Sequence, residues 1–162
     1  MTEFVLWLHE TPVSHAIREY QWFWAIAESV HFVGLALVLG VAGLFDLRLM
    51  GFLRHLSVTS VKALMPWAMA GFGLNLVTGT AFFVGAPEQY VTNPAWWAKV
   101  ACLVLAGANA LVFETWLGKR ALAVPAGGDT PGVVKVVGAV SLVSWLGVLY
   151  WGRMLPFIGN AF

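Results

Sequence analysis

Long runs of apolar residues dominate the chain and are separated by short polar segments. Crossing the roughly 30 Å hydrocarbon core of a bilayer takes about 20 apolar residues, and four stretches qualify. They cover residues 22–45, 65–85, 95–117 and 133–151. The pattern therefore predicts an all-α fold, an integral membrane four-helix bundle that forms a single transmembrane domain over residues 1–162.

Capping residues mark where several helices are expected to begin. Asn93-Pro94 and Thr130-Pro131 each place an N-cap residue before a proline at the first helical position. Thr11-Pro12 does the same for an earlier, shorter helix. The first twenty residues lack the basic region of a cleavable signal peptide. Phe4, Trp7 and Leu8 instead favour a short N-terminal helix at the membrane interface.

The positions of the basic residues predict the orientation of the bundle. Lys and Arg are retained on the cytoplasmic side of a bacterial membrane. The first and third loops and their flanks hold six of them, whereas the second loop, residues 86–94, has none. The six are Arg48, Arg54, Lys62, Lys119, Arg120 and Lys135. Both termini are therefore expected outside, in a multi-pass protein of the bacterial inner membrane.

Composition supports lipid as the solvent of this chain. Hydrophobic residues make up 60% of it and charged residues 10%, against about 25% charged in an ordinary soluble domain. The mean hydropathy is +0.80. These values exclude a soluble enzyme and a disordered chain, and the net charge of +1 implies no nucleic-acid partner. The expected partners are the lipid bilayer and either a second copy of the chain or a membrane redox protein.

Several polar residues inside the predicted spans are expected to hold the helices together. Asparagine in lipid bonds across helices for about 0.6 to 2 kcal/mol, and charges near an interface commonly form ion pairs. On this basis we predict a structural polar network. Its members are Asp46, Arg48, Asn75, Asn109 and Glu114.

Three other ionisable residues are predicted to form a site in the outer half of the bundle. A charge at the bilayer centre costs at least about 2.5 to 3.5 kcal/mol, so such residues indicate either an ion pair or a functional role. At 1.5 Å per residue from Trp22, Glu28 lies about 9 Å and His31 about 13 Å into the membrane. Lys99 enters from the same side, four residues into the third span. We therefore expect Glu28, His31 and Lys99 to share one site.

His31 is the one histidine within a predicted span, and three interpretations remain open. It is a buried hydrogen-bonded side chain, a proton relay with Glu28, or an axial ligand of haem or another metal. A two-haem electron conduit would need about four such histidines and is excluded within one chain. A single haem with Lys99 and Arg18 near its propionates remains open. Copper binding is a further alternative, with its ligands drawn from His9, His15, His31 and Met154.

Three segments resemble an uncharacterised family of bacterial four-helix inner-membrane proteins. They are WAIAESVHFVGLALVLGVAGLFDLRLMG at residues 24–51, MPWAMAGFGLNLVTGTAFF at 65–83 and NPAWWAKVACLVLAGANAL at 93–111. The resemblance covers nearly the whole chain. It implies the four-helix membrane fold and assigns no reaction.

The chain is more distantly similar to two other membrane families. His31 matches the histidine of the HemJ-type protoporphyrinogen oxidases, which bind haem, and Lys99 matches a lysine that these share with the copper-resistance D family. Asn109 follows as in the latter family. The resemblance implies b-type haem bound in the outer half, with His31 as metal ligand and a redox or haem-handling role. The alternatives are a small transporter or copper-handling protein with a polar Glu28–His31–Lys99 path, and a structural subunit of a larger membrane complex.

Overall fold

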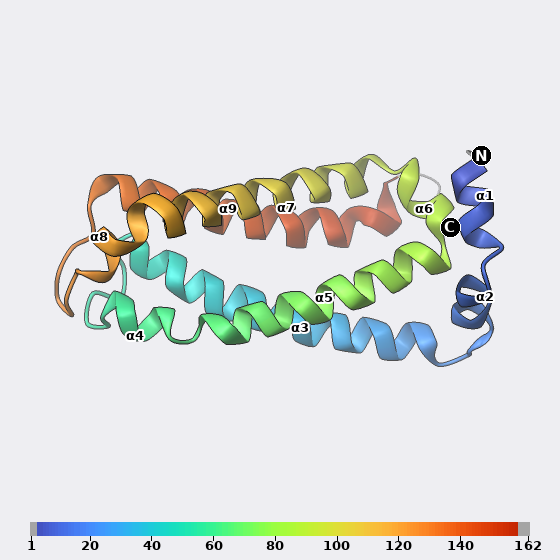
Figure 1. Cartoon of the computed structure of the whole chain (residues 1–162), viewed down its shortest axis with the longest axis horizontal. Helices are drawn as coiled ribbons and strands as arrows, with labels where there is room; N and C mark the ends of the chain where they lie inside the picture. The colour runs from blue at the N-terminus through green and yellow to red at the C-terminus, as the bar shows by residue number, and fades with distance from the viewer. Residues whose placement is uncertain (1–2, 159–162) are drawn as a thin grey trace.

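Four long helices form the body of the molecule (Figure 1). The computed structural model describes residues 3–158, and no strand occurs within that range. All four helices are long and apolar enough to cross a membrane. They are α3 (Phe23–Leu49), α5 (Met65–Gly85), α7 (Pro94–Val112) and α9 (Gly132–Met154). The prediction of an all-helical chain with four long apolar helices is confirmed.

Short helices gather at the two ends of this body (Figure 1). One end, here called the terminal end, carries α1 (Glu3–His9), α2 (Pro12–Glu19), α6 (Pro87–Val91) and a 3-10 turn, η2 (Leu155–Phe157). The opposite end, here called the basic end, carries α4 (Val58–Lys62), α8 (Gly118–Leu122) and the loops at residues 50–57 and 123–131. A π-helical turn, η1 (Phe113–Leu117), joins α7 to α8.

Two of the three predicted helix caps form as expected. The side chain of Asn93 accepts a hydrogen bond from the backbone N–H of Ala95 at 2.9 Å, and Thr11 accepts one from Ser14 at 3.3 Å. Thr130 does not cap α9, so that prediction is wrong. The helix begins one residue later, with Pro131 at the cap. The Thr130 hydroxyl donates instead to the backbone oxygen of Leu49 at 2.6 Å.

The four long helices are arranged as two hairpins, α3 with α5 and α7 with α9, joined along the α3–α9 seam. Glycines allow each close approach. A Cβ on Gly71 would lie 2.6 Å from the backbone oxygen of Gly34, and one on Gly147 would lie 2.7 Å from Cys102 Sγ. On the seam, a Cβ on Gly138 would lie 2.9 Å from a backbone oxygen of α3. Within the described residues, α5 and α7 form no comparable contact.

The hydrophobic core lies at the basic end, where both hairpins and the short helices α4 and α8 meet. Its buried members are Phe45, Leu49, Val58, Val61, Phe113, Leu117, Ala121, Val134 and Val137. In the described part of the chain, every side-chain hydrogen bond between the two hairpins and their loops also lies at this end. Figure 1 shows α3 drawing away from α9 toward the terminal end, while α5 rises toward α6.

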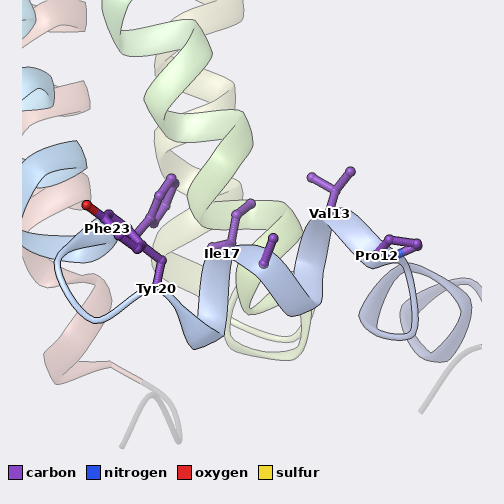
Figure 2. A pocket seen from close by; sticks show the side chains of 6 residues that line it. Pro12, Val13, Ile17, Tyr20 and Phe23 are labelled. Carbon is purple, nitrogen blue, oxygen red and sulfur yellow. The ribbon is translucent and has the colours of Figure 1, made fainter.

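The short helices α1 and α2 lie across the terminal end of the bundle (Figure 1). Ser14 is fully buried and donates to the backbone oxygen of Val84 at 2.8 Å, which fastens α2 to α5. The outer surface of α2 has a shallow apolar hollow of about 460 Å³ (Figure 2). Its lining residues are Pro12, Val13, Ala16, Ile17, Tyr20 and Phe23, so none of the predicted site residues contributes to it.

Candidate functional site

The imidazole of His31 is held by a two-step hydrogen-bond chain from α5. His31 Nδ1 lies 2.7 Å from Thr78 Oγ1, and Thr78 Oγ1 lies 2.7 Å from the backbone oxygen of Leu74. A carbonyl oxygen can only accept, so the single hydroxyl proton of Thr78 goes to Leu74. His31 Nδ1–H must then donate to Thr78. The ring is therefore the Nδ1–H tautomer, which leaves a lone pair on Nε2.

The neighbours of His31 on α5 leave room for the ring and position its backbone. Gly79 faces it, since a Cβ there would lie 3.8 Å from His31 Cε1. The ring of Phe82 lies 5.6 Å from the imidazole, centroid to centroid, and stacks on Trp24 at 5.5 Å. With its amide oriented to satisfy both groups, Asn75 donates to the backbone oxygen of His31 at 2.7 Å. The ring is thus half-buried within one hairpin.

Lys99 lies on α7, in the other hairpin, and its side chain packs on Gly152 of α9, where a Cβ would lie 3.7 Å from Lys99 Nζ. The three ion pairs within residues 3–158 use Arg54, Lys62 and Lys135 as their cations. Lys99 is in none of them, so it forms no ion pair with Glu28 within residues 3–158.

Glu28 lies one turn before His31, but its side chain is exposed. Its charge acts on Tyr90, a half-buried residue of α6. Burial first, and then the negative charge of Glu28, raise the pKa of Tyr90 to about 12. The phenol therefore stays protonated and can donate a hydrogen bond at any physiological pH.

Arg18, the second predicted cation of the site, lies in α2 at the terminal end. Its Nη2 donates to the backbone oxygen of His9 at 2.8 Å, which ties α2 to the end of α1. Its Nη1 is buried and has no hydrogen-bond partner among residues 3–158. The Nη1 group of Arg18 is therefore a hydrogen-bond donor without a partner in the described residues.

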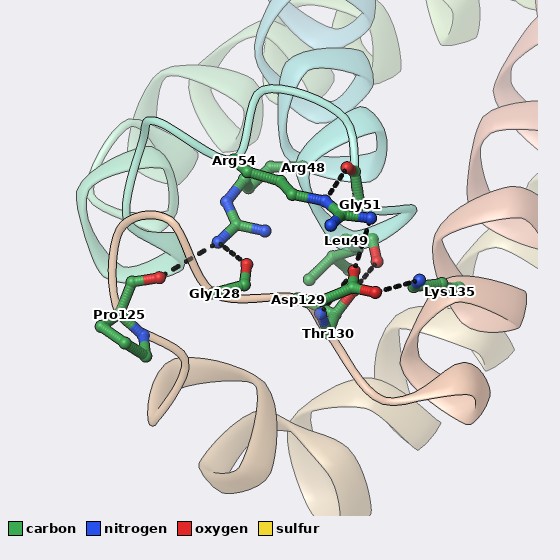
Figure 3. Close-up of polar contacts among 9 residues, drawn as sticks. All are labelled: Arg48, Leu49, Gly51, Arg54, Pro125, Gly128, Asp129, Thr130 and Lys135. Carbon is green, nitrogen blue, oxygen red and sulfur yellow. Dashed lines mark hydrogen bonds and ion pairs between the residues drawn. The ribbon is translucent and has the colours of Figure 1, made fainter.

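The five members of the predicted polar network form no hydrogen bond or ion pair with one another within residues 3–158. Arg48 is fully buried and donates to the backbone oxygens of Leu56 at 2.6 Å and Gly128 at 3.1 Å, so it holds two loops and no carboxylate (Figure 3). Glu114 pairs with Lys62 at 2.8 Å. A single network is therefore not formed, because each charged member has its own local partner or none.

The remaining members of that set face neighbouring helices. Asn109 donates to the backbone oxygen of Val137 at 3.0 Å, a bond from α7 to α9. Asn75 makes the α5–α3 contact described above. Asp46 is buried against α9, where a Cβ on Gly138 would lie 2.9 Å from its backbone oxygen, and its Oδ2 has no hydrogen-bond partner within residues 3–158. The asparagines thus act as interhelical contacts, whereas Asp46 is left with an unpaired oxygen.

The exposed ion pairs at the basic end centre on Asp129 (Figure 3). Lys135 Nζ lies 2.7 Å from Asp129 Oδ2, and Arg54 Nη2 lies 3.3 Å from Oδ1. The hydrogen bond from Lys135, supported by the charge of Arg54, holds the pKa of Asp129 below its ordinary value. Two cations share this one carboxylate.

One residue that contacts His31, Thr78, was not named as a site residue from the sequence. It resembles any helical threonine until α5 is placed against α3. The i, i+4, i+8 spacing of Gly71, Asn75 and Gly79 was the available signal, because it places Thr78 beside the face that packs on α3.

Within residues 3–158, no three His, Cys, Asp or Glu side chains gather in a way that could hold a metal ion. The histidines proposed for copper lie in different elements, His9 in α1 and His15 in α2, apart from His31 in α3. His31 is the one of these three histidines that lies in a long helix. No protein-family model, curated protein or solved structure matches this chain.

Proposed function

We propose that this chain is a multi-pass protein of the bacterial inner membrane, with both termini outside, that binds one b-type haem in the half of the bundle next to the terminal end. The observation that carries the proposal is the state of His31. Thr78 occupies its Nδ1, so Nε2 presents a lone pair. A hydrogen bond to the non-ligating nitrogen is the usual arrangement of metal-binding histidines.

The residues around His31 suit the apolar ring and the acidic propionates of a haem. Phe82 and Trp24 supply an apolar aromatic wall. Lys99, which has no acidic partner in the described chain, would pair with a propionate, and the free donor of Arg18 is a second candidate. With one protein ligand, bound haem would supply a one-electron couple and an open coordination position. The proposed role is redox chemistry or haem handling, as the distant resemblance to the HemJ-type family implies.

The test is the absorption spectrum of protein purified in detergent from haem-replete cells. We expect a Soret band that is lost in His31→Ala and retained in His55→Ala, which removes an exposed histidine from the loop at residues 50–57. Lys99→Gln is expected to keep the band but to lower haem retention. A colourless wild-type protein, or an equal loss in the His55 variant, would overturn the proposal.

A second candidate is a transporter with a polar path along α3, and Asp46 favours it. This carboxyl is buried on α3, the helix that carries His31, and its Oδ2 has no hydrogen-bond partner within residues 3–158. Intramembrane acids often mark ion pathways. In proteoliposomes, this function predicts ion uptake that fails in both Lys99→Met and Asp46→Asn. Uptake unaffected by either change would eliminate it.

A further inference from the structure

The basic end carries more positive charge than its own acids balance. Six of the nine Lys and Arg residues lie there with three of the eight acids, whereas the other three cations share the remainder of the chain with five acids. The three acids of the basic end are Asp46, Glu114 and Asp129. The excess of three positive charges is therefore a property of this end.

Most cations of this end are already engaged. Arg48 is buried against loop carbonyls, and Lys62 pairs with Glu114. Arg54 and Lys135 share Asp129. Lys119 and Arg120 on α8 are left over. Both side chains are exposed, and neither takes part in an ion pair within residues 3–158.

The two free cations lie just beyond the membrane boundary that tryptophans mark. Trp116 is 75% exposed and precedes Lys119 by three residues, and Trp67 at the same end of α5 is 62% exposed. Exposed tryptophans of spanning helices sit at the level of the lipid headgroups. Three residues advance a helix by about 4.5 Å, so Lys119 and Arg120 reach the depth of the lipid phosphates.

We propose that Lys119 and Arg120 bind the phosphate headgroup of an anionic phospholipid. A lipid fits better than a soluble phosphate because Trp116 gives the acyl chains an exposed apolar surface directly beside the cations. An anionic headgroup fits better than a zwitterionic one, whose own amine would meet the same positive charges. Basic residues at a membrane surface each strengthen such binding roughly five-fold.

The experiment measures lipid retention by native mass spectrometry of the full chain in a neutral detergent. The probes are phosphatidylglycerol, phosphatidylcholine with the same acyl chains, and inorganic phosphate. We expect the wild type to retain phosphatidylglycerol in preference to both other probes. Removing both cations in the Lys119→Gln/Arg120→Gln variant should weaken that retention about 25-fold.

Arg153→Gln is the matched control. It removes one exposed cation at the terminal end, where Arg153 lies over the ring of Phe157, and should leave retention unchanged. Far-UV circular dichroism checks that each variant keeps its helices. Equal retention of the two lipids, or an equal loss in Arg153→Gln, would overturn the proposal. Binding of inorganic phosphate as strong as that of phosphatidylglycerol would show an anion site without a lipid requirement and would also reject it.

Discussion

Replacing Thr78 with valine tests the tautomer of His31 directly. Valine keeps the branched shape of threonine and removes the hydroxyl, so His31 Nδ1–H loses its acceptor at 2.7 Å. An unsatisfied donor costs about 1 to 3 kcal/mol when buried. His31 is half-buried, which favours the lower value, near 1 kcal/mol. That energy corresponds to about a five-fold shift in the tautomer ratio toward Nε2–H.

The assay is magic-angle-spinning NMR of protein labelled with ¹⁵N-histidine in lipid bilayers, without haem. Protonated and unprotonated ring nitrogens resonate far apart, and a His31→Gln spectrum assigns the signal among the four histidines. We expect a protonated Nδ1 in the wild type, an increased Nε2–H population in Thr78→Val, and recovery in Thr78→Ser.

Thr80→Val is the control, because the Thr80 hydroxyl also bonds one turn back, to the backbone oxygen of Leu76 at 2.7 Å, but is exposed. It should leave the His31 signal unchanged. A wild-type ring protonated at Nε2, or a Thr78→Val spectrum identical to the wild type, would refute the proposed hydrogen-bond direction. Neither result depends on whether haem binds.

Three further predictions concern the scaffold. Arg48→Met should lower the free energy of unfolding in mixed micelles by about 3 to 5 kcal/mol, whereas the exposed Arg54→Met should cost less than about 1 kcal/mol; similar losses would contradict the role of Arg48. Gly71→Ala places a Cβ 2.6 Å from a backbone oxygen of α3 and should destabilise the fold by about 1 to 3 kcal/mol. Gly107 has open space around it, so Gly107→Ala should change stability by at most about 0.5 kcal/mol. The pKa of Asp129 is lowered in the folded state. Its contribution to stability is therefore complete above its ordinary pKa, near 4, and is lost as the pH falls through the folded-state value. Asp129→Asn should remove this acid dependence from unfolding curves, and an unchanged pH profile in that variant would reject the prediction.

The helices could be predicted because hydrophobic length and capping are local properties. Met65 begins α5 as expected, and Asn93 caps α7. Thr130 failed as a cap because its hydroxyl is directed to the backbone oxygen of Leu49 at 2.6 Å, a residue distant in sequence, and α9 begins one residue later with Pro131 at the cap. Local sequence cannot reveal such a competing partner.

Residues that share one face of a helix by spacing do not all contact a neighbouring helix. On α7, Lys99, Cys102 and Asn109 do contact α9. On α3, His31 and Asp46 face neighbouring helices, but Glu28 is exposed. A helical wheel gives angles around one axis and carries no information on where the neighbouring helices diverge.

The role of Arg48 could not be predicted from residue types. Its acceptors are main-chain carbonyls of two loops, at Leu56, Pro125 and Gly128. Every residue has such a carbonyl, so nothing in the sequence distinguishes these three. The expectation of a partner carboxylate followed from charge alone. In the fold, the Nε and Nη2 groups of Arg48 donate to backbone oxygens instead.

The concentration of bonds at the basic end has a mechanical consequence. If one hairpin rotated against the other about the joined loops near Arg48, atomic displacement would grow with distance from those loops. His31 lies seventeen residues from Arg48 along α3, about 25 Å at 1.5 Å per residue. A rotation of about 5° would therefore shift the imidazole by roughly 2 Å relative to the other hairpin.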